Sequence, residues 1–82
     1  MCYYVYILRC SDDTLYTGIT TDIQRRVKEH NNSQKAAKYT KVRRPVILVY
    51  EETYEDRSSA SKREYAIKQL TREEKLLLIK DK

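Results

Sequence analysis

Residues 3–9, with the sequence YYVYILR, constrain the fold of this chain more than any other stretch. Tyr3, Val5 and Ile7 would point to one side of a strand, and the residues between them are also apolar or aromatic up to Arg9. Apolar side chains on both faces are typical of a central strand that is covered on both sides. We therefore expect this strand to lie in the middle of a small sheet, with packing elements above and below it.

The turn after this strand decides which side chains share a face. Residues 11–14, SDDT, are turn formers, and Leu15–Ile19 follows as a second short strand. A plain two-residue loop would place Tyr6 and Tyr16 on opposite faces, because side chains alternate along a strand. If both tyrosines serve one site, an odd loop or a bulge must shift the register by one residue, and we predict such a shift. Gly18, inside the second strand, indicates a bulge or a close approach of the backbone.

A helix is expected after the hairpin, with Thr21 as its N-cap and Gln24 completing a capping box. The apolar periodicity continues to about Asn32. Arg26 and His30 lie one helical turn apart on the same stripe as the apolar residues, so both should face the sheet. They are either boundary residues, the arginine extending its charged end into solvent, or members of a functional site.

Residues 33–44 form the most basic stretch of the chain and contain no acidic residue. The whole chain carries 17 basic and 12 acidic side chains, a net charge of +5, which favours an anionic partner such as nucleic acid. The stretch is either a solvated connector with a short helix or turn, or a patch that contacts phosphates. Its candidate contact residues are Lys35, Lys38, Tyr39, Lys41, Arg43 and Arg44.

The second half of the chain predicts one more strand and two more helices. Val46–Tyr50 is apolar and rich in β-branched residues, and the strand should continue towards Tyr54. Asp56 or Ser58 can cap a helix over Ser59–Leu70.

Glu64 is an unusual member of the helix expected over 59–70. It shares a helical stripe with Ala60 and Ile67, so a carboxylate lies on an apolar face. Such a carboxylate can pair with a nearby arginine, or it can face a cleft as a metal ligand. The helical pattern leaves both alternatives open.

The order of the expected elements predicts an α+β fold. Thr71 and Glu74 form a capping box for a short C-terminal helix that includes Leu76–Ile79. The order is then strand, strand, helix, short helix, strand, helix, helix. Because hairpin strands precede the helices without repeated strand–helix alternation, we expect a small three-stranded, mainly antiparallel sheet flanked by helices. A chain of 82 residues is expected to form a single domain, 1–82.

The cysteines and the N-terminal residues indicate the compartment. On one extended strand Cys2 and Cys10 would lie roughly 26 Å apart, too far for a bridge. We expect two reduced thiols and no disulfide-linked partner. The first residues do not resemble a signal peptide, and no apolar run approaches the ~20 residues of a membrane span. A cytoplasmic protein without a membrane partner is the expectation.

The unusual positions, taken together, resemble the motifs of the GIY-YIG domain. The first motif corresponds to Tyr4-Val5-Tyr6 and the second to Tyr16-Thr17-Gly18. The helical Arg-x-x-x-His pattern matches Arg26 and His30, and the later glutamate of the family matches Glu64. The resemblance covers essentially the whole chain. It is closest to the small, stand-alone bacterial branch, which shows the same YTGIT, RR…HN, YT…RRP and IK…K run.

This resemblance implies metal-dependent cleavage of phosphodiester bonds. Glu64 would hold one Mg²⁺ or Mn²⁺ ion, and Arg26 would stabilise charge that develops on the scissile phosphate. Tyr6 would take the proton of the attacking water, with His30 assisting. Because the ordinary pKa of tyrosine is near 10, this role requires nearby positive charge, from Arg26 and the metal, to lower it. Tyr16 would orient the nucleophile or the phosphate.

The chain departs from the family motifs at three positions. Tyr4 stands where the first motif has glycine, and Val5 and Thr17 replace isoleucines. Asn31, next to the histidine, is an additional candidate for substrate contact.

The first hypothesis is a DNA endonuclease with a preference for particular structures or ends, working in repair or recombination. The alternative is a catalytically weak or inactive nucleic-acid-binding module of the same fold. A third interpretation is an adaptor that presents its basic face to an acidic protein. A nuclease needs Glu64 and Arg26 in one cleft with Tyr6, a binding module needs neither, and an adaptor would expose a contiguous apolar patch.

Overall fold

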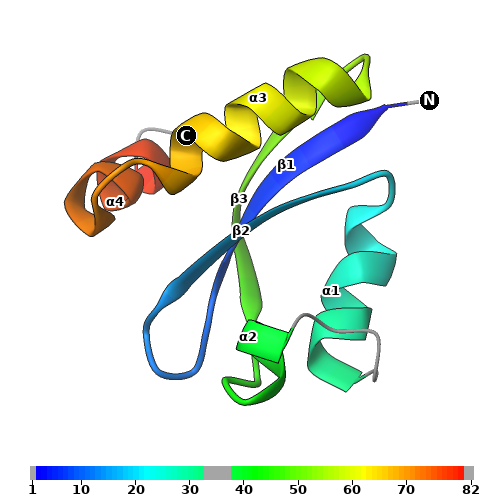
Figure 1. Cartoon of the computed structure of the whole chain (residues 1–82). Coiled ribbons are helices and arrows are strands. Elements are labelled where there is room, and N and C mark those ends of the chain that lie inside the picture. Colours follow the sequence, from blue (N-terminus) through cyan, green and yellow to red (C-terminus); the bar gives the residue numbers. More distant parts are fainter. Residues whose placement is uncertain (1, 33–37, 81–82) are drawn as a thin grey trace.

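A computed structural model describes residues 2–32 and 38–80 of the chain. The elements follow the expected order (Figure 1) and are β1 (Tyr3–Arg9), β2 (Leu15–Thr20), α1 (Ile23–Asn32), α2 (Lys38–Lys41), β3 (Ile47–Tyr54), α3 (Arg57–Lys68) and α4 (Arg72–Lys80). The three strands form one antiparallel sheet in the order β2-β1-β3, so β1 is the central strand. The expected α+β fold class and the central position of the first strand are confirmed.

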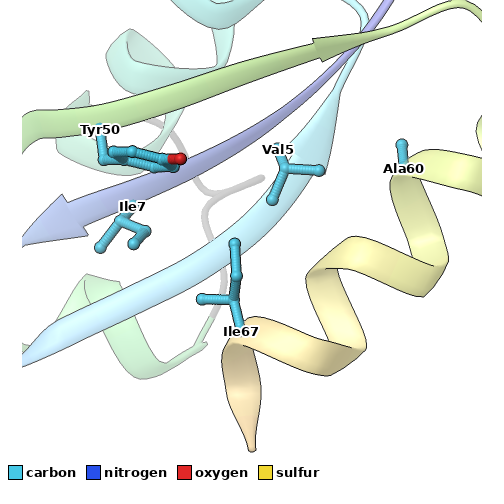
Figure 2. Packing of buried hydrophobic residues seen from close by; sticks show 5 residues of the cluster. All are labelled: Val5, Ile7, Tyr50, Ala60 and Ile67. Atoms are coloured by element: carbon cyan, nitrogen blue, oxygen red, sulfur yellow. The ribbon is translucent and has the colours of Figure 1, made fainter. Parts of the chain in front are cut away.

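One face of β1 packs against α3 and is apolar. The buried members of this cluster are Val5, Ile7, Tyr50, Ala60 and Ile67, drawn in Figure 2. The two helical side chains point from α3 towards the sheet, while the tyrosine comes from β3. Because the alternate residues of β1 point this way, the strand contributes an aliphatic surface to the α3 side.

The other face of β1 packs against α1. Tyr6 and Leu8 point to this side and form a second buried cluster with Val46, against which Ile23 and Val27 of α1 pack. Figure 1 shows α1 and α3 on different sides of the strands. β1 is therefore covered on both faces, as its continuous apolar pattern predicts.

The hairpin between β1 and β2 has the register shift that the sequence predicts. Tyr6 pairs with Gly18, and Tyr16 lies two residues earlier on β2, so both tyrosines point to the same face. The loop is Ser11–Asp13, because the residues on either side of it still pair through a backbone bond of 2.8 Å. Asp13 has a φ of 69°, the left-handed conformation that closes an odd-numbered hairpin loop.

The cap of α1 differs from the expectation. The side chain of Asp22, rather than Thr21, accepts a hydrogen bond from the Arg25 N–H at 3.1 Å. The Thr20 hydroxyl accepts in turn from the Asp22 N–H at 3.1 Å and so holds the capping residue in place. Threonine and aspartate are both good caps, and the observed cap is one residue later than expected, within the usual variation of helix ends.

The later helices begin with caps that the sequence predicts. Asp56 caps α3 by accepting from the Ser59 N–H at 2.7 Å, although the helix starts at Arg57 and thus earlier than expected. Thr71 and Glu74 form the reciprocal capping box, with bonds of 2.9 and 3.2 Å.

Within residues 2–32 and 38–80, no helix has both the length and the apolar character needed to cross a membrane.

Candidate active site

Tyr6 and His30 meet on the α1 face of the sheet. The Tyr6 hydroxyl oxygen lies 3.0 Å from His30 Nε2, and the two residues are 1% and 0% exposed. Tyr16 packs its ring edge-on against the imidazole, with 5.1 Å between ring centroids. Side chains from β1, β2 and α1 thus gather at one point, as the register shift and the helical spacing together predict.

Gly18 makes room for this arrangement. A Cβ atom at this position would lie 2.6 Å from the Tyr6 hydroxyl oxygen and 3.2 Å from the Tyr16 ring. Real side chains do not approach so closely, so a larger residue would displace the Tyr6 hydroxyl from its place above β2. The backbone of Gly18 has an ordinary negative φ. The glycine is therefore explained by a close approach, one of the two predicted reasons.

Arg26 lies beside the Tyr6 hydroxyl and within hydrogen-bonding reach of it. Its guanidinium also forms an ion pair with Glu29, with 3.0 Å between nitrogen and oxygen. The expectation that Arg26 faces the sheet with His30 is confirmed. Glu29 is half-buried and lies three positions along the helix from Arg26, so it can reach back to the guanidinium.

Glu64 lies close enough to the site for its charge to act on Tyr6. It projects from α3, which packs over both β1 and β2. The side chain is 23% exposed and pairs with Lys68 at 3.4 Å, so its partner is a lysine of the same helix rather than an arginine. The lysine side chain is itself 49% exposed, so the ion pair lies at the surface of the protein.

The site shifts the pKa values of Tyr6 and His30 in opposite directions from their ordinary values. Burial, followed by the neighbouring Tyr16, raises the pKa of Tyr6 to about 12, although Arg26 acts in the opposite direction. Burial, followed by the charge of Arg26, lowers the pKa of His30 to about 4. The expectation that Arg26 lowers the Tyr6 pKa is therefore correct in sign but outweighed by desolvation. Near neutral pH the site holds a protonated phenol and a neutral imidazole.

A stack of aromatic and cationic groups extends from the site. Tyr39 of α2 stacks on Tyr16, with 6.0 Å between centroids and 29° between planes. The Arg43 guanidinium lies 4.0 Å from the centre of the Tyr39 ring and pairs with Asp12 at 3.0 Å. Of the predicted nucleic-acid-binding residues, Tyr39 is thus adjacent to Tyr16, and Arg43 packs on Tyr39 while Asp12 of the β1–β2 loop pairs with it.

Arg44 and Asn31 have structural partners that the sequence does not reveal. Arg44 donates to the carbonyl oxygens of His30 and Glu29 and so caps the C-terminus of α1. The Asn31 side chain accepts from the Val46 N–H at 2.7 Å and donates to the Val46 carbonyl at 3.1 Å. These side chains tie α1 to the segment that leads into β3, so their bonds explain them without a substrate.

The remaining basic candidates lie on or near α2. Lys38 is exposed and Lys41 is half-buried, while Lys35 lies outside the described residues. Their contact with nucleic acid stays a prediction.

Sequence reasoning missed Thr40. This residue is fully buried, and its hydroxyl oxygen lies 2.7 Å from His30 Nδ1. The available signal was its place in the YT…RRP run, which contributes to the family resemblance without indicating a contact. With Thr40 on one side and Tyr6 on the other, both nitrogens of the imidazole have a protein partner.

Comparison with known proteins adds the evolutionary context. A model described as the GIY-YIG catalytic domain matches residues 2–76. A UPF0213 protein from Desulfotalea psychrophila is 64% identical over 78 residues, which cover 95% of this chain and 71% of that protein. A UPF0213 protein from Staphylococcus aureus strain Mu3 is 59% identical over 80 residues, covering 98% and 96% of the two chains.

Two solved structures have the same fold. The solution NMR structure of a UPF0213 protein from Bacillus halodurans is 45% identical with a TM-score of 0.65, and the match covers 100% of this chain and 86% of that one. The solution NMR structure of a protein from E. faecalis is 46% identical with a TM-score of 0.68, covering 99% and 85%.

Proposed function

This chain belongs to the GIY-YIG family, and from that premise we propose that it is a divalent-metal-dependent endonuclease that hydrolyses phosphodiester bonds in DNA. The observation that carries the proposal is the position of the Tyr6 hydroxyl, which lies 3.0 Å from His30 Nε2 and beside the Arg26 guanidinium. A proton acceptor and a fixed cation next to one buried hydroxyl suit the activation of water beside a phosphate.

The raised pKa of Tyr6 determines how it can act as a base. A protonated phenol can accept a proton from water only if it gives up its own. His30 Nε2 is the group placed to receive it. The water proton passes to the Tyr6 oxygen while the phenolic proton passes to His30, which becomes an imidazolium. Tyr6 thus relays the proton, and His30 stores it.

Bond formation at phosphorus then relies on Arg26 and Tyr16. The hydroxide oxygen bonds to phosphorus, and the bond to the leaving oxygen breaks. Solvent water supplies a proton to that oxygen, and the hydroxide so formed is neutralised when the His30 imidazolium releases its stored proton. Arg26 would donate hydrogen bonds to the non-bridging oxygens, where negative charge grows. Its pKa is raised by Glu29 and Tyr6 despite burial, so it stays cationic throughout. Tyr16, packed against the imidazole, would orient the phosphate or the nucleophile.

Glu64 suits a single hard cation. Mg²⁺ and Mn²⁺ bind proteins through one or two carboxylates, substrate phosphates and several waters. Among residues 2–32 and 38–80, no three histidine, cysteine, aspartate or glutamate side chains form a cage, so Glu64 would be the main protein ligand. Such an ion supplies neutralisation of phosphate charge and acidification of water. By acidifying the attacking water, the ion would compensate for the raised pKa of Tyr6 and the lowered pKa of His30, both of which make proton transfer harder.

The DNA would lie along the face that carries Tyr39 and Arg43, with Lys38 and Lys41 contacting phosphates. The net charge of +5 supports an anionic partner. We propose that the enzyme acts in the cytoplasm on particular DNA structures or ends during repair or recombination. The second candidate is a nucleic-acid-binding module, which is favoured by the raised pKa of Tyr6 and the lowered pKa of His30, because they keep both groups uncharged.

A cleavage assay with single-stranded, duplex, flapped and branched DNA in Mg²⁺ or Mn²⁺ separates the two candidates. Glu64→Ala should abolish cleavage while DNA binding is kept. Glu73→Ala, which removes an exposed carboxylate of α4, is the matched control and should cleave like the unmodified protein. Cleavage that survives Glu64→Ala would refute the assigned site. Salt-sensitive binding without cleavage by any protein would establish the binding module instead.

A further inference from the structure

We propose that Thr40 is a positioning residue that, together with Arg26 and Tyr6, holds His30 as the tautomer protonated at Nδ1. The tautomer is a property of the folded chain, while its consequence for cleavage rests on the proposed function. A neutral imidazole has one N–H and one acceptor nitrogen, so its tautomer decides whether Nε2 can receive a proton from Tyr6. Only the Nδ1–H form can take part in the relay.

The contact geometry restricts the imidazole from both sides. Thr40 and His30 are each 0% exposed, and 2.7 Å separates the hydroxyl oxygen from Nδ1. On the opposite nitrogen, Nε2 lies 3.0 Å from the Tyr6 hydroxyl. The imidazole therefore has a protein partner at each nitrogen. Because a neutral ring carries one N–H, it must accept at Nε2 if it donates at Nδ1, and the reverse.

Arg26 sets the direction of the Tyr6–His30 bond. A guanidinium can only donate hydrogen bonds, so the Tyr6 oxygen acts as the acceptor towards Arg26. The buried phenolic O–H still needs an acceptor, and His30 Nε2 at 3.0 Å is placed to be that acceptor. The imidazole proton therefore lies on Nδ1 and is donated to the Thr40 hydroxyl oxygen. In the opposite arrangement Nε2–H would donate to Tyr6, and Nε2 would have no lone pair with which to receive the phenolic proton.

The backbone of α2 holds Thr40 in this place. The Thr40 carbonyl accepts from the Arg43 N–H at 3.0 Å, which fixes the end of the short helix. Arg43 also donates from its side chain to the Tyr39 carbonyl at 2.9 Å. These bonds involve the backbone rather than the Thr40 hydroxyl, so a substitution that removes only the hydroxyl should leave α2 in position.

The chain contains a single histidine, so imidazole NMR signals report on His30 alone. The experiment compares proton–nitrogen correlation spectra of nitrogen-labelled unmodified protein, Thr40→Val and Thr40→Ser at neutral pH. The unmodified protein should show a protonated Nδ1 and an unprotonated Nε2. Thr40→Val, which replaces the hydroxyl by a methyl of similar size, leaves the buried Nδ1–H without its acceptor and should lose this pattern. Thr40→Ser, which keeps the hydroxyl, should retain it.

The same variants are then measured in the DNA cleavage assay. Thr40→Val should lower kcat on the order of 10- to 100-fold with little change in KM, the effect usual for groups that orient a functional histidine. Thr40→Ser should restore most of the rate. Since a merely structural role would change folding without changing the tautomer, the spectra separate the two explanations.

A protonated Nε2 in the unmodified protein would overturn the inference, as would an unchanged tautomer in Thr40→Val. If Thr40→Val does not fold, the unmodified protein and Thr40→Ser still decide, because both must show Nδ1–H. A protein with the expected tautomer but without cleavage on any DNA would refute the proposed nuclease while supporting the positioning role of Thr40.

Discussion

The two faces of β1 differ in what they bury. The α3 face packs Val5 and Ile7 against Ala60 and Ile67, with little polar chemistry between them. The α1 face buries His30 beside Tyr6, together with the Thr40 hydroxyl that contacts the imidazole. Alternate residues of one strand thus contribute to a mainly apolar core on one side and to a hydrogen-bonded polar site on the other.

This difference shows how a small sheet can carry a buried site. Burying a polar group costs free energy unless it is hydrogen-bonded, and on the α1 face each nitrogen of the imidazole has a partner. The α3 face supplies apolar burial that offsets the entropy of folding. Changes among the buried apolar residues of the α3 face should therefore act on stability, and changes to the buried polar residues of the α1 face should act on protonation and chemistry.

The largest expected effect comes from Ile67→Ala. Ile67 is fully buried on the α3 face, and its truncation leaves a cavity. We expect the free energy of unfolding to fall by about 2–5 kcal/mol in a denaturant titration. Leu77→Ala, which truncates an exposed side chain of α4, is the control and should change it by less than about 0.5 kcal/mol.

A second measurement on Ile67→Ala tests whether the two faces of β1 are independent. Because the sheet separates Ile67 from the imidazole, the NMR signals of the single histidine should keep their positions in folded Ile67→Ala. Displaced imidazole signals would show that the two faces are coupled through β1 and would contradict their separate roles.

The next effect is a pH dependence that comes from the α1 face. Burial lowers the pKa of His30 to about 4 in the folded state, whereas the unfolded chain binds that proton near pH 6.5. A group whose folded pKa is depressed stabilises the protein above its unfolded pKa and loses that contribution as the pH falls. Between about pH 6.5 and 4 the free energy of unfolding should therefore decrease by about 3 kcal/mol. Chemical denaturation at closely spaced pH values measures this loss.

His30→Gln is the matched control for this window, because it removes the titrating ring and keeps a polar side chain. The stability of His30→Gln should vary much less between pH 6.5 and 4, and parallel curves for the two proteins would contradict the assignment.

The Glu52 carboxylate, which Arg63 of α3 contacts, titrates at lower pH than an unpaired glutamate. Burial raises the pKa of Glu52, but bonds from Arg63, Tyr50 and Tyr54 outweigh it and lower the pKa below its usual value.

The sequence predicts the parts of the fold that depend on local patterns. The two apolar faces of 3–9 indicate a central strand. The shifted register follows if Tyr6 and Tyr16 share a site, because a plain two-residue loop would place them on opposite faces. The order of elements and the cap at Asp56 also follow from spacing and side-chain type. For the site, the spacing of Arg26 and His30 is sufficient to place both beside the sheet.

Features that depend on tertiary packing do not follow from the sequence. The pKa of Tyr6 is governed by desolvation, which is a property of the packed site. Arg44 looks the same in a sequence whether its guanidinium contacts a phosphate or the carbonyls of a helix end. The contact of Thr40 with His30 requires the chain to turn back through α2, and no periodic pattern describes that turn.

The smallest expected effect is a stabilisation on the α3 face. Thr17 of β2 is 4% exposed, and its hydroxyl oxygen is one of the buried polar atoms without a hydrogen-bond partner within the described residues. It pairs with Ile7 across the sheet, so it lies on the apolar side of β1. An unpaired hydroxyl in such surroundings costs about 1–3 kcal/mol, and a methyl group of the same shape avoids that cost.

Thr17→Val should therefore raise the free energy of unfolding by about 1 kcal/mol, which corresponds to roughly 4–8 °C in Tm for a domain of this size. Thr20→Val removes a hydroxyl that bonds to Asp22 at the start of α1 and should instead lower Tm. The imidazole signals and the cleavage rate of Thr17→Val should not change, because the altered methyl faces away from the site. A decrease in Tm for Thr17→Val would mean that its hydroxyl has a partner, and the α3 face would then be less apolar than the packing of Val5, Ile7 and Ile67 indicates.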